Sequence, residues 1–137
     1  MKRLVTLVAG AMAMISTAAF GGSVQPFPVD VDLVALSANG DMVTARYSAN
    51  DNEFIGCGIR VFDDGAGGTF SFGFCQAEDR DGERAFCNSQ NPDLLDAISS
   101  SGDFGFITFN YDEDGVCTRI GFSNQSFYLP KKLQSNE

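Results

Sequence analysis

The amino-acid sequence predicts an α+β fold: a small, disulfide-stapled domain made mainly of antiparallel β-sheet, with about 7 to 8 short strands in hairpins and one short helix near residues 92–99. Three observations support this prediction. Apolar and polar residues alternate along much of the chain, which is the period of a half-buried strand. Short turns rich in Gly, Asp and Asn separate the alternating segments. The period changes to that of a helix only after Asn91.

The chain begins with a segment typical of secretory signal peptides. Lys2 and Arg3 precede an apolar run over residues 4–15, which is too short to span a membrane, and residues 17–19 are small, as at a cleavage site. We therefore expect an exported protein, periplasmic or extracellular, with no membrane insertion after signal cleavage. The predicted divisions are a signal peptide at 1–19, an extended leader at 20–28, a single β-rich domain at 29–130 and a disordered tail at 131–137.

The mature chain carries a large negative charge. The full sequence has 9 basic and 18 acidic residues, and the loss of Lys2 and Arg3 leaves 7 basic residues and a net charge of −11. An acidic surface repels phosphate backbones and anionic lipids. Nucleic-acid binding is therefore not expected. The charge indicates a solubilising surface, with a basic partner as the alternative.

The first predicted hairpin is centred on Asn39-Gly40. Asn-Gly is the strongest short hairpin signal when strand-like segments flank it. The flanking segments here are residues 31–38 and 41–48, so we expect two strands at these positions.

The second predicted hairpin joins residues 54–62 to residues 69–77 through a Gly- and Asp-rich turn. Phe70, Phe72 and Phe74 share one face of the second strand, and we expect them in the core. The other face is gapped by small residues, which indicates that another element packs closely there.

A short strand at 84–88 follows the turn at 78–83, and the helix comes next. Asn91-Pro92-Asp93 supplies an N-cap, a proline at the first helical position and an acid that favours the helix dipole. The apolar residues that follow recur with helical spacing. A helix of about two turns is marginal alone, so it must gain its stability by packing.

Residues 105–122 form the best-specified hairpin of the chain. Both arms alternate in polarity and are rich in β-branched and aromatic residues, and a four-residue turn at 112–115 joins them. The predicted opposed pairs are Tyr111 with Val116, Phe109 with Thr118 and Ile107 with Ile120. This register places Cys117 on the face opposite to Phe109.

Residues 127–129 are expected to add a short edge strand.

The four cysteines predict two disulfides, because a short exported chain favours oxidised cysteines. Three connectivities are possible. Cys75 and Cys87 would lie directly opposite each other across a three-residue loop, but opposed strand positions often constrain a disulfide poorly. The favoured pairing is Cys57 with Cys75 and Cys87 with Cys117, because each bond ties neighbouring elements. The sequence separations of 18, 12 and 30 contain no C-x-x-C pair, so a zinc or iron–sulfur site is not favoured.

The composition excludes several kinds of catalysis. The chain has no histidine, which removes Ser-His-Asp and Cys-His catalytic sites and the commonest general base. Carboxylates are abundant, but they lie in predicted turns without an apolar pocket that would raise a pKa. We therefore do not expect an enzyme. A small carboxylate-dependent hydrolase or inhibitor-like factor stays as an alternative.

The acidic turns are the one positive indication of a ligand. Two of them share the D-x-D-G pattern found in calcium loops, and calcium prefers six to eight oxygen ligands. The same pattern is also what hairpin turns select, and the twelve-residue calcium frame is missing. No cofactor is expected, with a weak calcium site as the alternative. The candidate calcium ligands are Asp79, Asp81, Glu83, Asp112 and Asp114.

These observations lead to a hypothesis by elimination. A small acidic β-domain without a catalytic set is expected to be a non-enzymatic binding or interaction module whose partner is an unknown protein or envelope component. A calcium-stabilised secreted module is the alternative of a different class.

Overall fold

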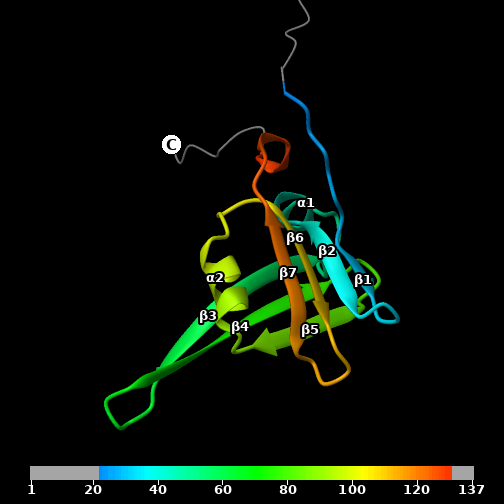
Figure 1. Cartoon of the computed structure of the whole chain (residues 1–137). Coiled ribbons are helices and arrows are strands. Elements are labelled where there is room, and N and C mark those ends of the chain that lie inside the picture. The colour runs from blue at the N-terminus through cyan, green and yellow to red at the C-terminus, as the bar shows by residue number, and fades with distance from the viewer. Residues whose placement is uncertain (1–21, 131–137) are drawn as a thin grey trace, which may run out of the picture.

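The structure, a computed structural model, describes residues 22–130 (Figure 1). The predicted signal peptide, the first two residues of the leader and the predicted tail lie outside the described residues. The described elements, in chain order, are β1 (Asp30–Asp32), β2 (Ser37–Asp41), α1 (Met42–Arg46), β3 (Phe54–Asp63), β4 (Thr69–Glu78), β5 (Arg84–Ser89), α2 (Pro92–Ser99), β6 (Phe106–Tyr111), β7 (Cys117–Ser123) and the 3₁₀ helix η1 (Ser126–Tyr128).

The strands form two antiparallel sheets, one with the order β1-β2-β6-β7 and the other with the order β3-β4-β5. This arrangement confirms the predicted α+β class. The buried residues come from both sheets, so the core lies where the two sheets face each other (Figure 1).

Helix α2 connects β5 of the second sheet to β6 of the first. Its Ile98 and Leu95 pack over Gly73, where an added Cβ would lie 2.6 Å from the Ile98 side chain. The small residue therefore makes room for the helix, as the gapped face of β4 predicts.

Two disulfides join neighbouring elements. Cys57 of β3 is bonded to Cys75 of β4, and Cys87 of β5 is bonded to Cys117 of β7. These are the two pairs that the sequence favours. The second bond links the two sheets, so its sulfur atoms lie in the core between them. Two disulfides are consistent with an oxidising, exported environment.

Between residues 22 and 130, no helix has the length and hydropathy needed to cross a membrane.

The prediction of a hairpin at Asn39-Gly40 is wrong. Both residues lie inside β2, and the turn that precedes them is stabilised by Asp32, whose side chain accepts hydrogen bonds from the backbone of Val34 and Ala35. Gly40 is needed for a different reason, because a Cβ there would lie 2.9 Å from the Cα of Val29. The chain after Gly40 forms helix α1 in place of the predicted second strand.

Asp41 explains why α1 begins where it does. Its carboxylate accepts a 2.7 Å hydrogen bond from Thr44 N, which caps the helix, and a 2.6 Å hydrogen bond from Phe27 N. The side chain is buried at 1% exposure. The same carboxylate therefore starts α1 and fixes the end of the leader against β2.

The hairpin over 105–122 is confirmed, but its predicted register is wrong by two residues along most of its length. Phe109 pairs with Ile120 and Asn110 with Arg119, whereas Tyr111 pairs with Cys117 across a β-bulge. The extra residue at the bulge turns Cys117 onto the core face, where it is 3% exposed. Sequence alternation alone could not reveal the bulge, because it assumes an unbroken period of two along the strand.

The predicted edge strand at 127–129 is also wrong, since residues 126–128 form η1. Phe106 explains the difference. It contacts both Phe27 of the leader and Tyr128, with ring centroids 5.1 and 5.9 Å apart. The end of the described chain therefore curls over the leader, and Gln25 N donates to the carbonyl oxygen of Phe127.

Candidate functional site

The first acidic turn uses its carboxylates to hold its own backbone. Asp79 is 7% exposed, and its Oδ1 accepts hydrogen bonds of 2.9 and 3.0 Å from Asp81 N and Glu83 N. Glu78 pairs with Arg84 at 2.7 Å. These contacts are the local hydrogen bonds of a tight turn. They account for the Asp79 and Glu78 carboxylates without a ligand, whereas Asp81 and Glu83 contribute backbone N–H groups to the turn.

The second acidic turn is built in the same way and lies elsewhere. Asp112 Oδ1 accepts from Asp114 N at 3.1 Å and from Val116 N at 2.9 Å. The first turn precedes β5, whereas the second lies beside the end of β5, where Asn88 forms a bridge with Val116. The five candidate calcium ligands are therefore divided between opposite ends of one strand.

Throughout the described part of the chain, no group of three or more His, Cys, Asp or Glu side chains is placed to hold one metal ion. A shared calcium site using both turns does not match this arrangement. Calcium binding at either turn alone stays a prediction.

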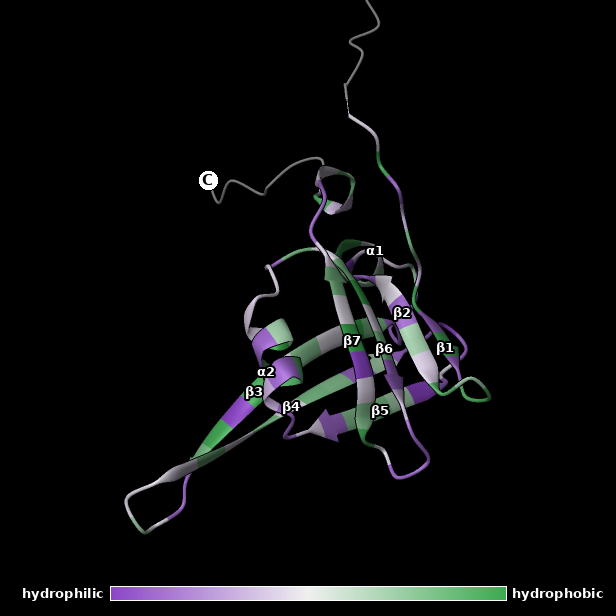
Figure 2. Cartoon of the chain, viewed as in Figure 1, coloured by the Kyte–Doolittle hydropathy of each residue, from purple (hydrophilic) through white to green (hydrophobic). Residues whose placement is uncertain are grey.

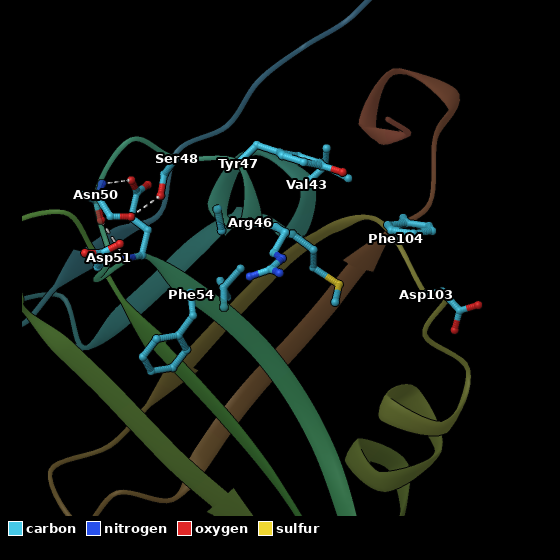
Figure 3. Close-up of a pocket in the computed structure, with 13 residues that line it drawn as sticks. Val43, Arg46, Tyr47, Ser48, Asn50, Asp51, Phe54, Asp103 and Phe104 are labelled. Carbon is cyan, nitrogen blue, oxygen red and sulfur yellow. Dashed lines mark hydrogen bonds between the residues drawn. The ribbon is translucent and has the colours of Figure 1, made fainter. Parts of the chain in front are cut away.

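A hollow of 540 Å³ lies between α1, the loop before β3 and the loop before β6 (Figure 3). Arg46 extends from α1 toward this space, and Tyr47 and Phe104 stand at its rim. The loop wall is held by Asn50, which donates to Glu53 at 2.6 Å. The lining mixes one cation with several carboxylates and exposed rings. Its walls show no set of polar groups converging on one point, so the hollow has the form of a surface recess.

An exposed apolar surface lies on the outer side of the second sheet. Five rings follow one another across three strands, and we call them the phenylalanine face: Phe62, Phe70, Phe72, Phe74 and Phe86. The ring centroids of Phe62 lie 5.3 Å from Phe70 and 5.9 Å from Phe72, both stacked. Phe74 lies 6.4 Å from Phe72 and from Phe86. Such spacings allow each ring to contact the next.

Strand register explains why these rings lie outside. Phe70, Phe72 and Phe74 alternate along β4 with Gly73 and Cys75, which are buried against α2 and the other sheet. Only one face of β4 can point inward, and the face with small residues and the disulfide does so. The expectation that the three phenylalanines belong to the core is therefore wrong. Phe70 is 49% exposed.

One sequence signal could have identified the outer face. Gln76 has the same parity in β4 as the three phenylalanines, and an amide side chain is more often exposed than buried. Arg60 lies on this face as well, with its guanidinium 4.8 Å from the Phe74 ring centroid.

The outer part of the β3–β4 hairpin carries this face away from the body of the protein. Residues 60–72, which we call the arm, project beyond the edge of the folded body (Figure 1). Figure 2 shows green stretches on both strands of the arm, with a purple, hydrophilic stretch between them on β3. Val61 is 64% exposed and Phe62 is 44% exposed. The arm therefore presents apolar side chains to solvent on both of its faces.

No protein-family model matches this chain, and no curated protein or solved structure is significantly similar to it.

Proposed function

We propose that this chain is an exported, non-enzymatic binding module and that its phenylalanine face docks on an apolar surface of a protein partner. The single observation that supports this proposal is the position of five neighbouring phenylalanine rings on the outer side of the β3-β4-β5 sheet. Aromatic residues are enriched in protein interfaces, because they provide a large contact area at a small cost in conformational entropy.

The size of the surface supports a binding role over a structural one. The rings fill no internal space, since the core is closed on the other side of the same sheet. Together they offer an apolar area on the order of several hundred Å², and patches of this size on monomers are often functional. The solvent face of a half-exposed antiparallel sheet normally carries polar residues, so an apolar solvent face favours a binding role.

The charge around the face indicates what surrounds the partner's apolar surface. The charge on the face is mixed, since Arg60 lies on it over Phe74 and Arg84 lies at its other end. Asp63 and Asp64 lie at the tip of the arm, and the chain as a whole is strongly acidic. A partner whose basic residues meet the tip of the arm fits this surface, since complementary potentials speed and orient association.

The test is a quantitative capture experiment with the oxidised mature protein, residues 20–137, and an extract of the envelope and medium of the producing cell. Phe86→Ser removes an exposed ring from β5, far from the arm, and Val34→Ser removes an apolar side chain that is 96% exposed on another surface. We expect one protein to be enriched by the wild type and by Val34→Ser, and to be lost with Phe86→Ser.

Two results would contradict the proposal. One is an identical set of captured proteins for all three baits. The other is capture of nothing by a wild-type bait whose circular dichroism and disulfide mass confirm that it is folded.

A further inference from the structure

Among the strands of residues 22–130, none lies beside the outer edge of β3. In the sheet order β3-β4-β5, β3 is an edge strand, and β5 begins to pair with β4 only at Gly73. The arm is therefore a two-stranded ribbon, a form that is marginal in water on its own. An exposed, apolar edge strand is a template on which another strand can pair. The question is which strand fits it.

The ladder between β3 and β4 determines which backbone groups face the free edge. Asp64 N donates to Gly68 O at 3.0 Å, so residue 64 directs its backbone groups toward β4. Hydrogen-bonded and non-hydrogen-bonded pairs alternate in an antiparallel ladder. The backbone groups of Phe62 and Arg60 therefore also face β4, and those of Val61 and Asp63 face solvent at the edge.

The edge is complementary to itself in an antiparallel register centred on Phe62. When Phe62 is placed opposite Phe62 of a second copy, Val61 falls opposite Asp63, and their outward backbone groups meet as hydrogen-bonded pairs. In the same register Arg60 falls opposite Asp64 of the second copy. A shift of two residues toward the body places Val61 opposite itself and Arg60 opposite Phe62, so the pair of opposite charges is lost. A shift of two toward the tip places Asp63 opposite itself, and a shift of four toward the body places Arg60 opposite itself. Like charges directly opposite are unfavourable.

We propose that a second copy of this chain pairs with the free edge of β3, antiparallel and centred on Phe62, to form a two-fold symmetric dimer. The two three-stranded sheets then become one continuous sheet of six strands. Because the symmetry axis is perpendicular to the sheet, both phenylalanine faces lie on the same side. The contact is short, and such interfaces are weak and depend on concentration.

The charges on the arm agree with this register. Within residues 22–130 the only ion pair joins Arg84 to Glu78, so neither Arg60 nor Asp64 has a partner of opposite charge. The Asp64 carboxylate is ionised at neutral pH, and the backbone N–H groups of Ala66 and Gly68 lower its pKa further from the ordinary value of 3.8. The inference rests on the edge of β3 and not on the proposed partner of the phenylalanine face.

The first test is sedimentation velocity over a range of concentrations for the oxidised mature protein. Val61→Pro removes the N–H that faces the edge, and it leaves the ladder to β4 intact because that N–H makes no bond within the hairpin. Val61→Ala is the matched control, because it shortens the side chain and keeps the N–H. We expect the dissociation constant of the dimer to be at least about tenfold higher for Val61→Pro than for Val61→Ala.

The second test determines the register. In the proposed dimer the two copies of residue 62 form a non-hydrogen-bonded pair, so Phe62→Cys should form a disulfide-linked dimer when oxidised glutathione is the oxidant. Val34→Cys, on an exposed turn, is the control for random crosslinking. Arg60→Asp should weaken the dimer, whereas the same charge change at the exposed Arg119 of β7 should not.

Three outcomes overturn the inference. A wild-type protein that stays monomeric up to about 1 mM shows that the edge does not pair with itself. Equal dimerisation of Val61→Pro and Val61→Ala moves the contact away from this edge. A Val61→Cys protein that crosslinks to itself more readily than Phe62→Cys excludes the proposed register. Loss of partner capture by Phe86→Ser, with dimerisation unchanged, would separate this inference from the proposed function.

Discussion

The two halves of the β3–β4 hairpin have a similar composition and very different surroundings. In the inner half, Ile55, Cys75 and Ala77 are buried, because β5, the disulfides and the first sheet surround them. In the arm, Val61 and Phe70 continue the apolar pattern but are 64% and 49% exposed. An apolar side chain is therefore buried only where the fold supplies a second layer. The same residue types stabilise the body and form an exposed apolar surface on the arm.

The largest expected effect comes from a phenylalanine in the body. Phe109→Ala removes the largest fully buried side chain, at 0% exposure, and leaves a cavity between the sheets. We expect a loss of about 3 to 5 kcal/mol in the free energy of unfolding, measured by denaturant titration. A loss below about 1 kcal/mol would show that the core can collapse around the cavity and would remove the contrast with the arm.

The disulfide between the sheets gives the next largest effect. Replacing Cys87 and Cys117 together by Ala opens a link across 30 residues, which corresponds to about 3 to 4 kcal/mol in the chain-entropy description. The double substitution avoids a lone thiol. Thermal unfolding of this variant beside the wild type provides the measurement. An unchanged melting temperature would mean that packing alone holds the two sheets together.

Asp41 tests the polar part of the body. Asp41→Asn replaces one acceptor oxygen by an N–H₂ group, so either Thr44 N or Phe27 N loses its hydrogen-bond acceptor. We expect a loss of about 1 to 3 kcal/mol in unfolding free energy. Asp30→Asn, at an exposed residue of β1, is the matched control and should have little effect. Equal stabilities of the two variants would contradict the role of the Asp41 carboxylate.

Loss of a phenylalanine ring should lower the unfolding free energy less in the arm than in the body. Phe70→Ala removes a ring that is about half exposed and lies beside Phe62 without closing a core. We expect a loss below about 1 kcal/mol, measured in the same denaturant titration as Phe109→Ala. A loss comparable with that of Phe109→Ala would mean that the arm is packed against something in solution, and sedimentation would then show whether this is a second copy.

The smallest expected effect is a dependence of the unfolding free energy on pH, caused by Tyr128 of η1. Burial, and then the negative charge of Asp41, raise the pKa of Tyr128 above its ordinary value of 10.0. Above about pH 10 the unfolded chain releases this proton before the folded chain does, so stability falls as the pH rises. The decline should be less steep in Tyr128→Phe. Denaturant titrations between pH 8 and pH 11 on both proteins measure it, and equal slopes would exclude Tyr128 as the source.

Local features of the sequence predicted several elements correctly. Asn91-Pro92 marks the start of α2, because capping and proline geometry act within one turn of chain. The turn at 63–68 marks the β3–β4 hairpin, because its glycines adopt positive φ at Gly65 and Gly67. By contrast, the hairpin predicted at Asn39-Gly40 is wrong. A glycine is needed both in a tight turn and where two backbones lie close together, and the sequence does not distinguish the two.

The sequence by itself determined the class of the fold, the hairpins with local turns, the helix and the absence of histidine chemistry, because each depends on residues close in the chain or on composition. The tertiary structure alone decided the bulge at Cys117, the start of α1 at Asp41 and the side of the sheet on which the phenylalanines lie. All three depend on what packs opposite them from distant parts of the chain. Alternation shows that a strand has two faces, but only the second layer decides which face is buried.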